Sequence, residues 1–322
     1  MPPLTFTEAF TFKPLSNHEF ETIHFPERMG NALNIAYGGY ALAVACKGAY
    51  LTVPAGYHLY SMLGNFLGPA FTDRILSISV RQVRQTRTFA TRFVEVSQTM
   101  DSGERRLCLV ALCDFQIQES SLLAYSAPPR MTYTPHSCLP TADIAKAAQV
   151  QSGTITQQLS DAHSKNFAPS FRYFDTRHCP EGIFAQNFSG MLKHVPTTQD
   201  HLKITEKATA EWVRARHTLE REVDNVVALV FNMDAAIAFA PLSFSHMFVD
   251  DVAACSTLEF ALRLFSNDIK MEEWHLREMT TANAAEGRTF SEARLWDEGG
   301  RMCASMSQQG IMRPKKGEGA KL

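Results

Sequence analysis

The sequence lacks the features of membrane, secreted and general nucleic-acid-binding proteins. No apolar run approaches the roughly 18 residues that cross a bilayer, so no interaction with membrane is expected. The N-terminus has no basic segment followed by an apolar run, which argues against a secretory signal. The net charge of −2 argues against nucleic acid as a partner. With 322 residues, the chain suits two domains of about 150 residues each.

The common motifs of metal, cofactor and nucleophile chemistry are absent too. The seven cysteines include no Cys-x-x-Cys pair, and the eleven histidines form no His-x-x-x-His motif, so we expect no metal site and no disulfide framework. There is no Gly-x-Ser-x-Gly elbow and no phosphate-binding glycine loop, so we expect no cofactor. His178 and Cys179 are neighbours, but neighbours on a strand point in opposite directions, which disfavours a Cys–His nucleophile.

The sequence does contain a repeated pattern. Apolar helical stretches begin at residues 40–44 and 227–231, and each ends at a proline. Residues 87–90 recur as 288–291, and residues 101–103 recur as 297–299, with separations of about 190–200 residues. Matches in the same order indicate a duplicated domain. Where the first copy has Lys47 and Leu112, the second has Asp234 and Gln308, so we expect the second copy to carry the chemistry.

One helix followed by strands in each copy predicts an α+β fold with antiparallel sheets. We expect helices near residues 39–51 and 220–239. The expected strands lie near residues 75–80, 91–96, 107–112, 206–216, 256–265, 274–281, 289–296 and 302–311. The predicted boundaries are an N-terminal domain at 1–125, a Pro/Ser/Thr-rich linker at 126–170 with a short helix near 141–150, a C-terminal domain at 171–313 and a flexible tail at 314–322.

Three polar residues of the second copy are candidates for catalysis. Asp234 falls on the apolar stripe of the predicted helix, where an ionised carboxylate needs partners or a wet cavity. A structural Asp paired with an arginine or with backbone amides is the alternative. Gln308 on an inward-facing strand can hold a water or donate to an oxyanion, and Thr257 at a strand start can orient a water. Either residue is otherwise an ordinary strand residue.

Four arginines are crowded in the first copy, at positions 81, 84, 87 and 92. Clustered guanidinium groups suit phosphates, including those of coenzyme A. Arg84, Arg87 and Arg92 are therefore candidate substrate-binding residues. A solvated basic strand face is the alternative interpretation.

The chain resembles the acyl-CoA thioesterase II family, in which two hotdog domains are fused. The family's catalytic Asp, Thr and Gln match Asp234, Thr257 and Gln308, the last in Gln308-Gln309-Gly310-Ile311-Met312-Arg313. Further motifs of the family are matched by residues 37–39 (Tyr-Gly-Gly), 66–70 (Phe-Leu-Gly-Pro-Ala) and 212–215 (Trp-Val-Arg-Ala). The chain departs from the family at Gly68, which replaces an arginine, and at residues 259–260, where Glu-Phe replaces Asp-His.

The resemblance implies a double hotdog fold, with a sheet wrapped around a central helix in each domain. It implies hydrolysis of an acyl-CoA thioester to free acid and coenzyme A, with Asp234 as the base and with Gly38 and Gly39 at the substrate. The departures leave two alternatives open. One is a specialised enzyme acting on a polyketide-type or other secondary-metabolite acyl thioester, and the other is a non-catalytic acyl-CoA-binding protein.

The last three residues, Ala320, Lys321 and Leu322, resemble the Ser-Lys-Leu peroxisomal address. They follow a polar tail, which would leave them free for a receptor. We therefore expect the peroxisomal import receptor as a partner and the peroxisomal matrix as the location, with the cytoplasm as the alternative. Exposed sheet edges in hotdog proteins usually pair, so we also expect a homo-oligomer.

Overall fold

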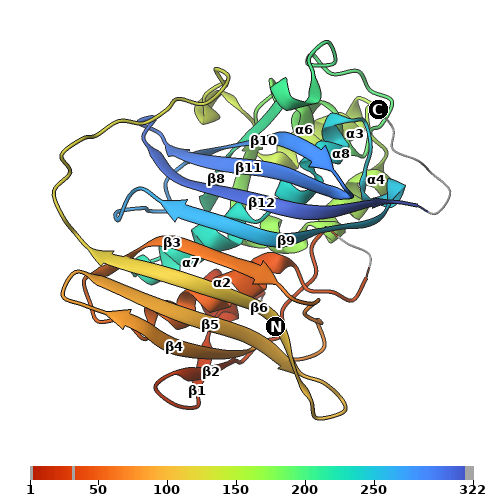
Figure 1. Ribbon diagram of the computed structural model, residues 1–322. Coiled ribbons are helices and arrows are strands. Elements are labelled where there is room, and N and C mark those ends of the chain that lie inside the picture. Colours follow the sequence, from red (N-terminus) through yellow and green to blue (C-terminus); the bar gives the residue numbers. More distant parts are fainter. Residues whose placement is uncertain (1–2, 31–32, 316–322) are drawn as a thin grey trace.

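The computed structural model describes residues 3–30 and 33–315 and has one antiparallel sheet of 12 strands (Figure 1). The terminal Ala320-Lys321-Leu322 lies outside the described residues. The strand order is β1-β2-β4-β5-β6-β3-β9-β12-β11-β10-β8-β7. The strands are β1 (Phe12–Pro14), β2 (Glu19–Thr22), β3 (Tyr57–Phe66), β4 (Ser77–Gln85), β5 (Phe89–Thr99), β6 (Arg105–Ile117), β7 (Phe174–His178), β8 (Ala208–Ala215), β9 (Val252–Leu264), β10 (His275–Ala285), β11 (Arg288–Asp297) and β12 (Met302–Pro314).

The sheet is continuous because the two copies join through one pair of strands. β3 of the first copy pairs antiparallel with β9 of the second, from Ser61 opposite Arg263 to Asn65 opposite Glu259. On each side of this junction the sheet continues with the strands of one copy. In Figure 1 the junction lies where the orange β3 meets the blue β9. The predicted α+β class and the duplication are confirmed. β3 was missed, because its sequence alternates poorly between apolar and polar residues.

Two helices, α2 (Gly38–Tyr50) and α7 (Glu222–Met233), pack side by side on the sheet (Figure 1). Both are buried along almost their whole length. The small residues of α2 permit this, because alanine and glycine let neighbouring elements approach closely. The helical stretch 222–244 is long and apolar enough to cross a membrane by length and composition. However, 89% of its most apolar window is buried inside the protein, as in a core helix.

The linker region is more helical than its composition predicts. The expected helix is present as α3 (Ala142–Gln151), and Thr141 caps its first turn. A second helix, α4 (Gln157–Asn166), was missed because its sequence is polar and shows little apolar periodicity. Packing of His163 against aromatic rings holds α4 in place. The remaining short helices are α1 (Phe6–Ala9), α5 (Ala168–Tyr173), α6 (Ile183–Gln186) and α8 (Ala240–Phe244).

The second central helix ends six residues earlier than predicted. α7 stops at Met233, Asp234 is its C-terminal cap residue, and Ala236 adopts a left-handed conformation with φ of 71°. No glycine or proline marks this end in the sequence. Arg277 on β10 fixes it, because its guanidinium donates to the carbonyl oxygens of Asn232 and Ala235.

The match of Lys47 with Asp234 is not a structural equivalence. Lys47 lies inside α2, and its ammonium group donates to the carbonyl of Phe10 at 2.8 Å. Asp234 instead follows the end of α7. Lys47 therefore ties the N-terminal segment to its helix, whereas Asp234 stands at a helix end that opens into a cavity.

The candidate substrate-binding arginines of the first copy have different surroundings, and Arg92 is buried in the fold. Arg92 is only 1% exposed, and its guanidinium donates to the carbonyl oxygens of Thr52 and Arg84 and to the side chain of Gln85. Arg84 lies 3.8 Å from Asp114 and stacks on Phe89. Arg87 is exposed at the β4–β5 turn. A guanidinium committed to buried carbonyls has no free donors for phosphate, so the substrate-binding prediction is wrong for Arg92.

We predict that Arg92→Ala destabilises the fold without weakening substrate binding. Its loss leaves buried carbonyl oxygens unpaired, so the free energy of unfolding should fall by about 2–4 kcal/mol in urea denaturation. The Michaelis constant for an acyl-CoA ester, the substrate that the resemblance implies, should not change. Arg288→Ala, at an exposed arginine at the start of β11 that does not line the cavity, is the matched control and should alter neither quantity. An unchanged stability together with a raised Michaelis constant would contradict this structural role.

Candidate active site

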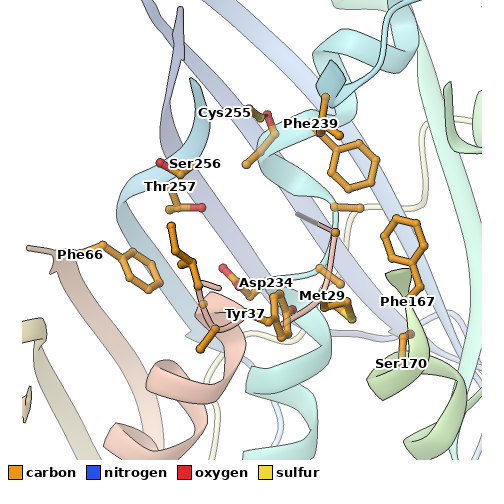
Figure 2. A pocket seen from close by; sticks show the side chains of 18 of the residues that line it. Met29, Tyr37, Phe66, Phe167, Ser170, Asp234, Phe239, Cys255, Ser256 and Thr257 are labelled. Atoms are coloured by element: carbon orange, nitrogen blue, oxygen red, sulfur yellow. Dashed lines mark hydrogen bonds between the residues drawn. The ribbon is translucent and has the colours of Figure 1, made fainter. Parts of the chain in front are cut away.

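A cavity of about 590 Å³ opens where the N-terminus of α2 meets the C-terminus of α7. In Figure 2, Phe66 and Thr257 line one side of it, and Phe167 and Ser170 lie across from them. Asp234 lies between these sides, next to Tyr37. A largely apolar cavity of this size, with a few convergent polar groups, is typical of a small-molecule site.

Asp234 is the acidic group at the centre of this cavity, and its carboxylate is held from several directions. Gln308 Nε2 donates to Asp234 Oδ1 at 2.7 Å. Burial raises the pKa of Asp234 to about 6, against the opposing effects of Gln308, the backbone N–H of Gly39 and the charge of Arg277. A carboxylate with a pKa near neutrality is suited to act as a general base.

Thr257, Gln308 and Asp234 form one hydrogen-bonded chain. Thr257 Oγ1 donates to Gln308 Oε1 at 3.0 Å, and the amide nitrogen of Gln308 donates onward to Asp234. Thr257 and Asp234 line the cavity, whereas Gln308 is 1% exposed and lies behind them on β12. Gln308 therefore orients the other two side chains. The hydroxyl hydrogen of Thr257 is committed to Gln308, which leaves its oxygen lone pairs as acceptors.

Gly38 and Gly39 bring the start of α2 against this carboxylate. A Cβ on Gly38 would lie 3.0 Å from Asp234 Oδ2 and 3.0 Å from the ring of Phe66. A Cβ on Gly39 would lie 2.2 Å from the ring of Tyr37. Both positions need glycine because the helix start must approach the site closely. The positive end of the helix dipole then favours negative charge at Asp234 and on a substrate oxygen.

The structure thus brings together Asp234, Thr257, Gln308, Gly38 and Gly39. Arg84, Arg87 and Arg92 are not among the residues that line the cavity. The described ranges 3–30 and 33–315 contain no group of three His, Cys, Asp or Glu side chains able to hold a metal.

Two residues that hold the helix ends at the site were not identified from the sequence. The Tyr37 hydroxyl donates to the carbonyl of Phe231 at 2.6 Å and joins the ends of the two helices. It stood within the Tyr-Gly-Gly motif, which was a usable signal. Arg277 had no local signal, because it reaches the end of α7 from β10, more than 40 residues away in sequence.

Comparison with protein-family models matches both halves of the chain. Residues 25–116 match the acyl-CoA thioesterase N-terminal domain, and residues 160–312 match the acyl-CoA thioesterase C-terminal domain. The two matches do not overlap and together span most of the chain. A search of curated proteins found no match.

Solved structures share the fold over nearly the whole chain. The acyl-CoA thioesterase II TesB2 of Mycobacterium marinum is 18% identical with a TM-score of 0.69, and the match covers 98% of this chain and 99% of that one. A hotdog protein of unknown function from Alicyclobacillus acidocaldarius is 15% identical, with a TM-score of 0.68 and coverage of 96% and 97%. A putative thioesterase II of Thermobifida fusca is 15% identical, with a TM-score of 0.65 and coverage of 97% and 98%.

These structures confirm the double hotdog fold, and the family models confirm the resemblance read from the sequence. The chain belongs to the acyl-CoA thioesterase family of thioester hydrolases and carries the family's N-terminal and C-terminal domains in tandem.

Proposed function

We propose that this protein hydrolyses an acyl-CoA thioester to the free acid and coenzyme A, with Asp234 as the general base. The observation that carries the proposal is the chain from Thr257 through Gln308 to a cavity-lining carboxylate whose pKa is raised to about 6. A thioester needs only an activated water and a stabilised oxyanion, so neither a covalent acyl-enzyme nor a metal is invoked.

The hydrogen-bond directions at the site support a water held between Thr257 and Asp234. Thr257 donates to Gln308, so its oxygen accepts one hydrogen of the water. Asp234 Oδ1 accepts from Gln308, which leaves Oδ2 to accept the other hydrogen. A water with both hydrogens bound directs a lone pair towards the thioester carbonyl carbon, which is the orientation that attack requires.

In the proposed reaction, Asp234 takes up one proton and later returns it. The water oxygen bonds to the carbonyl carbon, and Asp234 takes the proton that leaves the water. Negative charge develops on the carbonyl oxygen, and the N-terminal end of α2 at Gly38 is placed to stabilise it. The carbon–sulfur bond breaks, the thiolate of coenzyme A takes a proton from Asp234, and the acid is released.

The direct test is release of free thiol from a panel of acyl-CoA esters that differ in chain length and branching. Hydrolysis of at least one ester supports the proposal. Tight binding of esters without thiol release from any of them would overturn it and favour a non-catalytic acyl-CoA-binding protein.

We predict that Asp234→Asn strongly lowers turnover but does not destabilise the fold. Turnover should fall roughly 10²–10⁴-fold, which is the usual contribution of a positioned base. The raised pKa means that stability is full at low pH and decreases as pH rises through about 6. The ionised carboxylate therefore costs the fold on the order of 3 kcal/mol above that pH, and the neutral amide removes this cost.

The measurements are thiol release and the thermal midpoint of unfolding at about pH 8. The midpoint of Asp234→Asn should equal or exceed that of the wild type. Asp101→Asn, at a fully exposed carboxylate in the β5–β6 turn, is the matched control and should behave as the wild type. Full activity in Asp234→Asn would eliminate Asp234 as the base.

We also predict that the rate depends on pH through the ionisation of Asp234. The base must be ionised, so kcat should fall as the pH decreases through about 6 in the wild type. The hydrogen bond from Gln308 lowers the pKa of Asp234, so Gln308→Ala should move this acidic limb to higher pH. Gln309→Ala changes the neighbouring residue on β12 and should leave the limb in place. If Gln308→Ala leaves the acidic limb in place, Gln308 does not influence the pKa of the base.

A further inference from the structure

The cavity extends beyond Asp234 to a wall where polar groups interrupt the apolar lining. Phe167, Phe184 and Phe239 line this part, and they are the kind of surface that receives an acyl chain. His163 of α4 lines the same cavity and packs against Phe167, with 4.8 Å between ring centroids. Figure 2 shows Phe167 and Ser170 on the side of the cavity away from Phe66 and Thr257. A wall built only for hydrocarbon has no need of an imidazole.

His163 is buried, and one of its ring nitrogens makes no hydrogen bond to the residues that the structure describes. It is 5% exposed and surrounded by aromatic rings, the nearest being Phe188 at 4.4 Å between centroids. Its Nδ1 has no hydrogen-bond partner within the described part of the chain. Burial lowers the pKa of His163 to about 3, with His178 and Lys146 adding to the effect, so the ring is neutral at ordinary pH. A neutral imidazole offers one N–H donor and one nitrogen acceptor.

A row of ionic and polar groups beside His163 disfavours an anionic ligand. His178, Glu211 and Arg277 lie directly opposite one another on β7, β8 and β10, and all three line the cavity. Arg277 is bound to Glu211 and to the end of α7. Burial alone would raise the pKa of Glu211, but Arg277 and His178 hold it at about 2, so the carboxylate stays charged. A negative group here would meet Glu211 and an arginine that is already paired.

We propose that this wall binds a neutral oxygen, a hydroxyl or carbonyl, carried by the acyl group at a distance from its thioester, with His163 as the hydrogen-bonding partner. This inference rests on the proposed function, since it names the class of acyl group that the same site takes. Hydroxyls of Ser170, Thr176 and Ser189 line the cavity as well and suit a second hydrogen bond. A plain alkyl chain would offer the imidazole of His163 no hydrogen bond where the ring lines the cavity, which carries a free-energy cost.

The test compares a decanoyl chain with the same chain carrying one hydroxyl, moved carbon by carbon from the thioester to the end. Each chain is attached to coenzyme A through a non-hydrolysable thioether, and its affinity is measured by calorimetry with the full-length protein. The ligand with its hydroxyl at one particular carbon should bind roughly tenfold or more tightly than the ligand with the plain chain. This is the usual effect of pairing a buried polar group. Equal or weaker binding of every hydroxylated chain would overturn the proposal.

Variants then assign the preference to His163. His163→Phe keeps an aromatic ring but removes both nitrogens, so the preference for the hydroxylated chain should disappear while the plain chain binds at least as well. His163→Gln keeps a donor and an acceptor and should retain part of the preference. His201→Phe, at an exposed histidine that does not line the cavity, is the matched control. A preference that survives in His163→Phe would assign the recognition elsewhere.

The thioether ligands separate this inference from the proposed function. Hydrolysis of thioesters without a preference for any hydroxylated chain would sustain the hydrolase and reject the acyl-group inference. Selective binding of a hydroxylated thioether by a protein that releases no thiol from the corresponding ester would do the reverse. Circular dichroism of each variant shows whether a loss of binding reflects a loss of fold.

Discussion

The structure depends on the burial of one carboxylate at the end of a central helix. Asp234 is 7% exposed, and an isolated charge in such a place would cost several kcal/mol. Three groups reduce that cost: the amide of Gln308, the start of α2 at Gly39 and the charge of Arg277. They come from β12, α2 and β10, so the three elements must keep their positions around the end of α7. The remaining burial penalty is what gives the carboxylate the pKa of a base.

The buried polar side chains of the two duplicated halves make different kinds of contact. In the second half, polar side chains on α7, β9 and β12 form the Asp–Gln–Thr chain. In the first half, Lys47 and Arg92 are buried on backbone carbonyls and serve the fold. The first half still contributes to the site through the start of α2 and through Phe66 at the end of β3. The β3–β9 junction places these groups beside Asp234, so neither half forms the cavity by itself.

The wall of the cavity around His163 is built largely from the region between the two copies and the start of the second. α4 and α5 contribute His163 and Phe167, and β7 contributes His178. The Asp–Gln–Thr chain instead sits on elements of the second copy that have counterparts in the first. Under the proposed function, the reaction and the choice of acyl group would be carried by different segments of the chain.

The sequence by itself determined the duplication and the α+β class, since these depend on periodicity, and motifs local to one segment gave the family resemblance that pointed to the three polar residues of the site. Only the tertiary structure decided where α7 ends, because Arg277 terminates it from a distant strand with no glycine or proline as a signal. It also showed Arg92 to be a structural residue and His163 to line the cavity. Burial and cross-strand partners decide what a charged or polar side chain does, and both are properties of packing that a single segment does not contain.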